Sequence, residues 1–186
     1  MTTTEAELAR FIDRDTVEYV RTYPHPIERV WNAITDPAQM SDWFGPLQFE
    51  PRLGSAWVAL WEEDSPFKGV ITAFEPPRLV RFGSPHINAV NYWQFELESV
   101  TGGTRMVFTQ LIRSSDYVNV HNWPADPPEH PAGERNPWRP GTLSGWHRSF
   151  DHLGVLMDGG VWVRASQSER DALDQRYRDH MLAMQP

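Results

Sequence analysis

The chain has 186 residues, which is enough for one compact domain with a sizeable core, and it contains no cysteine. Disulfides, thiolate chemistry and cysteine-ligated metal sites are therefore excluded, and a reducing cytoplasm is the expected location. Seventeen basic and 25 acidic residues give a net charge of −8 without any basic cluster, so neither nucleic acid nor an anionic membrane surface is an expected partner.

The chain begins with a polar, acidic segment that is expected to be neither a signal peptide nor a membrane span. Residues 1–15 have no apolar run, and no stretch of the chain approaches the ~18 apolar residues that a spanning helix needs. We interpret 1–15 as an N-terminal extension and 16–160 as the domain. Nine tryptophans and nine phenylalanines stand out, because such side chains fill cores, interfaces or apolar ligand sites.

One strand and two short helices are expected at the start of the domain. β-Branched and aromatic residues predict a strand over Thr16–Tyr23, which Pro24 and Pro26 end. Apolar residues at helical spacing over Ile27–Ile34 predict the first helix. The turn Thr35-Asp36-Pro37 stops this helix and starts a second one, which runs to Gly45.

The middle of the chain changes to short runs of period two, separated by turn residues. Because the connections are short, consecutive strands should be antiparallel neighbours. The six expected strands are Leu47–Pro51, Ser55–Trp61, Phe67–Phe74, Leu79–Phe82, Tyr92–Ser99 and Thr104–Arg113. Their alternation predicts one aromatic face, formed by Trp57, Ala59, Trp61, Trp93, Phe95, Leu97, Met106, Phe108 and Gln110.

A proline-rich segment without periodicity follows over 114–140, with six prolines between Pro124 and Pro140. Unstructured connections longer than ~12–15 residues are uncommon in compact domains and are often lids or binding loops. A lid and a surface loop without a function are equally acceptable interpretations here.

Two further helices are expected in the C-terminal part. Leu143, Trp146, His147, Phe150, Leu153, Gly154 and Met157 form an apolar stripe over Thr142–Met157, with Thr142 as N-cap and Gly159-Gly160 as the end. The extension 161–186 contains a predicted amphipathic helix, Gln167–Met184, with the apolar row Leu173, Tyr177 and Met181. This row would either dock on its own domain or form a homodimer with a second copy.

These elements predict an α+β fold in which a curved antiparallel sheet of seven strands wraps around the long helix. The two short helices would close one end of the sheet. Such a curved sheet leaves a gap between sheet and helix that is widest at one end, and this gap predicts a ligand cavity lined by tryptophan.

Four segments resemble the Bet v 1-like (START/SRPBCC) superfamily, and specifically its Activator of Hsp90 ATPase homolog 1-like branch. The first is VEYVRTYPHPIERVWNAITDPAQMSDWFGP, and the second is Lys68-Gly69 followed by Glu75-Pro76-Pro77-Arg78-Leu79-Val80. The third is Gly103-Thr104-Arg105 before an alternating strand, and the fourth is Gly145-Trp146-His147 with Phe150-Asp151, Leu153 and Gly159. The resemblance covers 16–160 and implies the helix-grip fold.

The functional implication of this resemblance is broad. Wider relatives bind hydrophobic molecules, lipids and polyketides, a minority catalyse cyclisation or dehydration, and the branch is named after a co-chaperone. We expect an apolar, aromatic or polyketide-like small molecule to bind between the sheet and the long helix. The alternatives are a cyclase, aromatase or hydro-lyase in the same cavity, and a co-chaperone acting on an Hsp90-type ATPase, because fold does not decide function.

The expected ligand-binding residues combine the aromatic face with the helix stripe. They are Trp57, Trp61, Trp93, Phe95, Met106, Phe108, Gln110, Trp146, His147 and Phe150. His147 is the candidate catalytic acid or base, although a hydrogen bond to a neighbouring carbonyl or water is the favoured interpretation. Gln110 would meet the ligand, meet His147, or lie at the solvated end of its strand, and the last is favoured.

Neither a metal nor an organic cofactor is expected. His121, Asp126, Glu129 and His130 have metal-binding side chains, but they lie in an irregular segment and lack the spacing of a helical metal site. The sequence also contains no nucleotide-binding glycine motif and no recognisable nucleophile motif.

Overall fold

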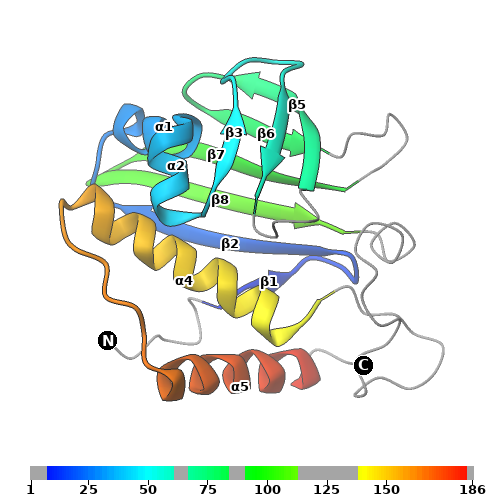
Figure 1. Cartoon of the computed structure of the whole chain (residues 1–186). Helices are drawn as coiled ribbons and strands as arrows, with labels where there is room; N and C mark the ends of the chain where they lie inside the picture. Colours follow the sequence, from blue (N-terminus) through cyan, green and yellow to red (C-terminus); the bar gives the residue numbers. More distant parts are fainter. Residues whose placement is uncertain (1–7, 61–66, 84–90, 113–137, 184–186) are drawn as a thin grey trace.

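The computed structural model describes residues 8–60, 67–83, 91–112 and 138–183. The predicted α+β helix-grip fold is confirmed: one curved antiparallel sheet holds a long helix on its concave face (Figure 1). The strands are β1 (Arg10–Phe11), β2 (Thr16–Tyr23), β3 (Leu47–Phe49), β4 (Ala56–Ala59), β5 (Phe67–Glu75), β6 (Leu79–Gly83), β7 (Tyr92–Val100) and β8 (Gly103–Leu111).

The sheet has eight strands in the order β1-β2-β8-β7-β6-β5-β4-β3, one more than the sequence predicts. The additional strand is β1, whose two residues pair with β2 by Arg10 opposite Glu18 and Phe11 opposite Val17. The prediction assigned this segment to an extension because two residues carry no readable alternation. The six strands from β3 to β8 form the expected meander of hairpin neighbours.

Two short helices close one end of the sheet: α1 (Ile27–Thr35) and α2 (Pro37–Trp43) (Figure 1). Asp36 ends α1 and caps α2, since its side chain accepts hydrogen bonds from Ala38 N at 2.8 Å and Gln39 N at 3.3 Å. The indole of Trp43 donates to Ala33 O at 2.9 Å, which fixes α2 against α1. The local signals in Thr35-Asp36-Pro37 therefore produce the predicted break.

The long helix α4 (Pro140–Met157) lies across the concave face of the sheet. It begins at Pro140, with Arg139 as N-cap residue, so the predicted N-cap at Thr142 is wrong by three positions. Proline suits the first helical turn because that turn's N–H groups have no partner inside the helix. At its C-terminal end, Gly159 has φ 73° and ends the helix as predicted, since glycine adopts this backbone region without strain.

Two tyrosines of β2 hold α4 on the sheet. The hydroxyl of Tyr19 donates to Leu143 O at 2.8 Å, and that of Tyr23 donates to Phe150 O at 3.1 Å. Both rings are buried, so each hydrogen bond is formed away from water, where an unpaired hydroxyl would be costly. The two bonds lie two turns apart and fix the position of the helix along β2.

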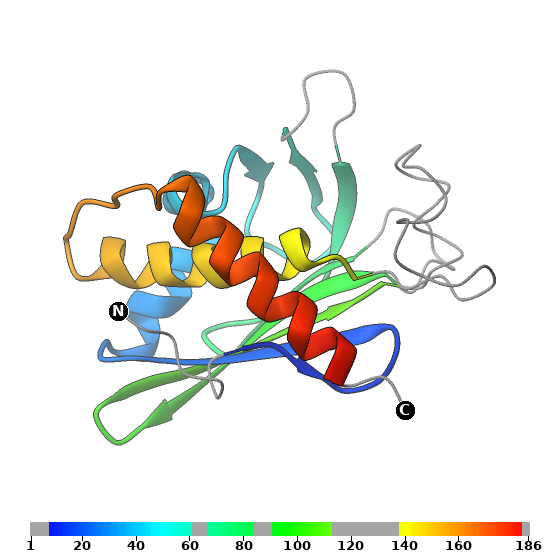
Figure 2. The same cartoon turned by 90° about the horizontal axis from the view of Figure 1, so that it is seen from below.

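The helix α5 (Gln167–Ala183) crosses α4 on the side away from the sheet and ends over β1 and β2 (Figure 2). Tyr177 and Met181 are buried in the core, and Leu173 packs against it. The row of residues that was one candidate for a homodimer contact thus docks on its own chain. A homodimer through other residues of this helix stays a prediction.

The predicted aromatic face is the core of the protein. Inward side chains alternate along the strands, so that Trp57 and Ala59 on β4, Trp93, Phe95 and Leu97 on β7, and Met106 and Phe108 on β8 are all buried. None of the helices in the described part of the chain is both long and apolar enough to cross a membrane.

Candidate functional site

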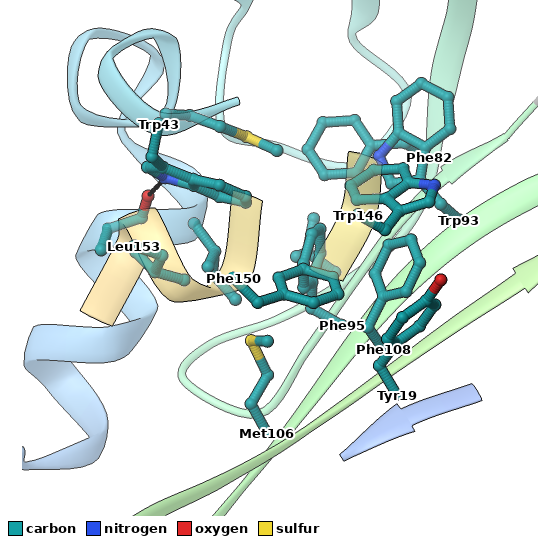
Figure 3. Packing of buried hydrophobic residues seen from close by; sticks show 14 of the residues in the cluster. Tyr19, Trp43, Phe82, Trp93, Phe95, Met106, Phe108, Trp146, Phe150 and Leu153 are labelled. Carbon is teal, nitrogen blue, oxygen red and sulfur yellow. Dashed lines mark hydrogen bonds between the residues drawn. The ribbon is translucent and has the colours of Figure 1, made fainter. Parts of the chain in front are cut away.

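Aromatic rings from five elements and from the turn after α2 meet between the sheet and the middle of α4 (Figure 3). We call this group the aromatic cluster, and it consists of Phe44, Trp57, Phe82, Trp93, Phe95, Phe108, Trp146 and Phe150. Each ring lies within 6.5 Å of at least one other, measured between centroids. The cluster lies where β7 begins and β8 ends, against the middle of α4, and we take this end of the two strands as the candidate ligand site.

Trp146 connects the helix side of the aromatic cluster to the sheet side. Its ring stacks on Phe44 at 5.0 Å and on Phe150 at 5.6 Å, with interplanar angles of 23° and 20°. On the sheet side, its ring lies 4.2 Å from that of Phe108 and 6.4 Å from that of Trp93. Trp146 and Trp93 are each 8% exposed, whereas Phe108 and Phe150 are fully buried, so the two indoles form the outer side of the group.

A second layer of rings extends the aromatic cluster across the sheet. Trp93 stacks on Phe82 at 5.6 Å and contacts Trp57 at 4.5 Å. The indole of Trp57 donates to Gly83 O at 3.1 Å and lies over Gly69, its cross-strand partner. A side chain at Gly69 would overlap this indole, so glycine is required here by close approach rather than by backbone conformation.

Gln110 is the polar residue at the edge of the aromatic cluster. It is half-buried on the concave face of β8, directly opposite Trp93 on β7 and Val17 on β2. Its Oε1 accepts a hydrogen bond of 2.7 Å from Trp146 Nε1. Gln110 therefore bonds Trp146, which the sequence predicted on the facing helix, and not His147.

His147 lies on a different side of α4 from Trp146, because adjacent residues in a helix are separated by about 100°. Its buried ring packs edge-on against Tyr177 of α5, and its Nδ1 is 3.0 Å from the Tyr177 hydroxyl. Asp151 Oδ2 is 3.6 Å from Nε2. The structure thus places His147 in the α4–α5 interface and not beside the aromatic cluster.

Burial lowers the pKa of His147 to about 3, and the positive charges of Arg21, Arg176 and Arg148 act in the same direction. The ring is therefore neutral at physiological pH. Burial raises the pKa of Tyr177 to about 12, so this hydroxyl keeps its proton. A neutral imidazole bonded to a neutral phenol is a structural contact, and a role for His147 as catalytic acid or base remains a prediction.

Two members of the aromatic cluster were missing from the sequence-based site. Phe44, which follows α2, stacks on Trp146, and Phe82 of β6 stacks on Trp93. The signal for Phe82 was present, since it alternates with Arg81 in a predicted strand. No pattern in the sequence could reveal Phe44, because it belongs to the turn after α2 and its contact depends on how that helix docks.

Several predicted residues lie outside the described part of the chain. These are Trp61, the segment 114–137 of the proline-rich connection, and the four residues weighed as metal ligands, His121, Asp126, Glu129 and His130. Met106 is described and lies buried in the core beside Phe108 on the same face of β8. Within 8–60, 67–83, 91–112 and 138–183, no group of three or more His, Asp or Glu side chains could hold a metal ion.

Comparison with solved structures supports the fold. A conserved protein of unknown function from Enterococcus faecalis has a TM-score of 0.69 at 14% identity, covering 96% of this chain and 91% of its own. CalU16 from Micromonospora echinospora has a TM-score of 0.64 at 19% identity, with 95% and 93% covered. DynU16, a protein in the dynemicin biosynthetic locus, has a TM-score of 0.56 at 20% identity, with 78% and 48% covered.

No curated protein matches the sequence. The family described as Activator of Hsp90 ATPase homolog 1-like protein matches residues 24–158, which include α1, α2, all strands from β3 to β8, and α4. Because this match spans well over half of the chain, the protein belongs to the Activator of Hsp90 ATPase homolog 1-like family.

Proposed function

We propose that the protein binds an apolar, aromatic or polyketide-like small molecule at the aromatic cluster, between the sheet and α4. The single observation that carries this proposal is the position of Trp146. Its indole stacks between two phenyl rings, faces a third, and holds the polar group of Gln110 at the edge. We further propose that the protein acts in the cytoplasm, in keeping with its lack of cysteine.

Binding would exchange ring–ring contacts within the protein for ring–ring contacts with the ligand. Phe44 is half-buried and sits outside the regular elements, so it is the ring that can move aside with least loss of core packing. A planar ligand in its place would stack on Trp146 and contact Trp93, which lies 6.0 Å from Phe44. Burial of apolar ligand surface contributes about 25 cal/mol per Å².

A structural neighbour gives this proposal additional support. DynU16 comes from the dynemicin biosynthetic locus, and it shares the fold with this chain. Binding has more support than catalysis here, because His147, the candidate acid or base, is bonded to Tyr177 in the α4–α5 interface.

A titration of planar aromatic compounds, followed by tryptophan fluorescence, tests the proposal. We expect a saturable change in emission for the wild type, and Phe44→Leu should tighten binding, because the ligand no longer has to displace the ring that stacks on Trp146. The matched control is Trp162→Leu, since Trp162 stacks on His152 in the segment after α4 and is not in the aromatic cluster. Linear, unsaturable changes for every compound would contradict the proposal, as would equal ligand affinities of the two variants.

A further inference from the structure

The side-chain amide of Gln110 has a fixed orientation, and the chemistry of its partner determines which way it points. The indole Nε1–H of Trp146 can only donate, so the atom facing it at 2.7 Å must be the amide oxygen. The amide NH₂ group consequently points away from Trp146. Asn and Gln amides are often ambiguous in orientation, but a donor-only partner removes the ambiguity.

This NH₂ group supplies two hydrogen-bond donors at the edge of the aromatic cluster. Among residues 8–60, 67–83, 91–112 and 138–183, Trp146 is the hydrogen-bond partner of Gln110, and no acceptor there bonds its Nε2. Gln110 is half-buried, so water can satisfy these donors in the free protein. A ligand that fills this end of the aromatic cluster would displace that water, and it would have to supply an acceptor for the Gln110 NH₂ group in place of the water oxygen.

The strand register puts this donor beside the proposed ligand ring. Gln110 is paired directly with Trp93 across β7 and β8, and Phe108 precedes it on the same face. Trp146 is thus both the stacking surface and the group that holds the amide, so ring position and donor position are set by one side chain. A polar atom on the ligand would meet Nε2 only if it projects from the edge of the stacked ring.

We propose that Gln110 is a specificity-determining residue that selects planar aromatic ligands bearing an exocyclic oxygen acceptor, such as an aryl ketone. This inference rests on the proposed ligand-binding function. An aromatic hydrocarbon of the same shape would leave the two N–H donors buried without an acceptor. Sites with a buried donor discriminate in this way against analogues that lack the acceptor.

The test compares 2-acetylnaphthalene with 2-isopropenylnaphthalene, which has a CH₂ group in place of the ketone oxygen and otherwise nearly the same shape. By calorimetric titration, the wild type should bind the ketone more tightly, by roughly threefold to tenfold, as one neutral hydrogen bond contributes. Gln110→Met should abolish the preference by weakening ketone binding. Gln110→Glu keeps an oxygen for Trp146 but loses the NH₂ donors, and it should also remove the preference.

The outcomes separate this inference from the function on which it rests. If the wild type binds both compounds with equal affinity, the selective role of Gln110 is overturned while the ligand site stands. If it binds neither, the proposed function itself is overturned for this ring class. The comparison in the wild type requires no variant to fold, and circular dichroism of Gln110→Met and Gln110→Glu shows whether their titrations report on a native protein.

Discussion

Nδ1 of His147 lies 3.0 Å from the hydroxyl oxygen of Tyr177, and this contact joins α4 to α5 through the interior of the protein. The same hydroxyl accepts a hydrogen bond of 3.3 Å from Ala9 N, so it also ties the segment before β1 to the two helices. Around it, Arg148 lies 3.6 Å from Asp174, and His180 Nε2 lies 2.9 Å from Ala9 O. The C-terminal helix is therefore part of the folded domain.

Replacement of Tyr177 by phenylalanine should lower the free energy of unfolding by about 1–3 kcal/mol. The substitution keeps the buried ring but removes the hydroxyl, which leaves Ala9 N and His147 without their partner. Urea denaturation monitored by circular dichroism measures the effect. The control is Tyr92→Phe at the half-buried start of β7, where we expect a change within about 0.5 kcal/mol. Equal effects of the two substitutions would refute the prediction.

Stability should fall with acidification because of His147. Its pKa is lowered to about 3 in the folded protein by burial and by Arg21, Arg176 and Arg148, whereas the unfolded chain titrates near the ordinary histidine pKa of about 6.5. The unfolded state therefore binds more protons between these values. The contribution of His147 to the free energy of unfolding is fully present above pH ~6.5. Below that pH it is lost by about 1.4 kcal/mol per pH unit, down to pH ~3.

The pH dependence is measured by urea denaturation between pH 7 and 4 for the wild type and His147→Gln. The variant should show a shallower loss of stability, with a residual slope from His152, whose pKa burial also lowers. Identical slopes for the two proteins would show that His147 does not carry the effect.

Alanine at position 69 should disturb the aromatic cluster. A Cβ atom there would overlap the Trp57 indole and the carbonyl oxygen of Gly83, which accepts the indole hydrogen bond. Overpacking of this kind costs about 1–3 kcal/mol, and we expect a shift of tryptophan emission as Trp57 moves. Gly145→Ala in α4 is the matched control, because a Cβ there meets nothing within 4 Å and alanine favours helix. A Gly69→Ala protein as stable as Gly145→Ala would contradict this account.

Removal of the cap at Asp36 should weaken the α1–α2 corner. Asp36→Ala loses the acceptor for Ala38 N and Gln39 N and should cost about 1 kcal/mol in thermal unfolding. Asp36→Asn retains a side-chain oxygen and should be close to wild type at neutral pH. The hydrogen bond from Gln39 N is the main cause of the lowered pKa of Asp36. Protonation of this carboxylate in acid should therefore remove the stabilisation that the cap gives to the wild type. Equal losses for both substitutions would exclude capping as the cause.

The sheet and its aromatic face could be predicted because strand periodicity leaves little choice. Once Trp93 and Phe95 point inward, a period of two forces Gln94 to the other face, and in the structure its Oε1 accepts from Arg81 on that outer side. The extra strand β1 could not be predicted, because its two residues are a strand only through their pairing with β2.

The side of α4 on which His147 lies could not be read from its spacing. The apolar stripe from Leu143 to Met157 is wide enough to pack against both the sheet and a second helix. The spacing does not indicate which side of the stripe faces the sheet and which faces the helix. In the structure Trp146 faces the sheet and His147 faces α5, a division set by the path of the chain after Gly159. Long-range docking of this kind is decided by tertiary packing and leaves no local pattern.

The α5 helix also fixes where recombinant forms of this protein can end. The family match stops at residue 158, and a fragment cut there would lack the 17 residues of α5 that cover His147 and contribute Tyr177 and Met181 to the core. Such a fragment would expose apolar side chains that α5 covers in the full chain, and it should precipitate during purification. Expression boundaries should therefore include the whole of α5, and affinity tags should be placed outside it.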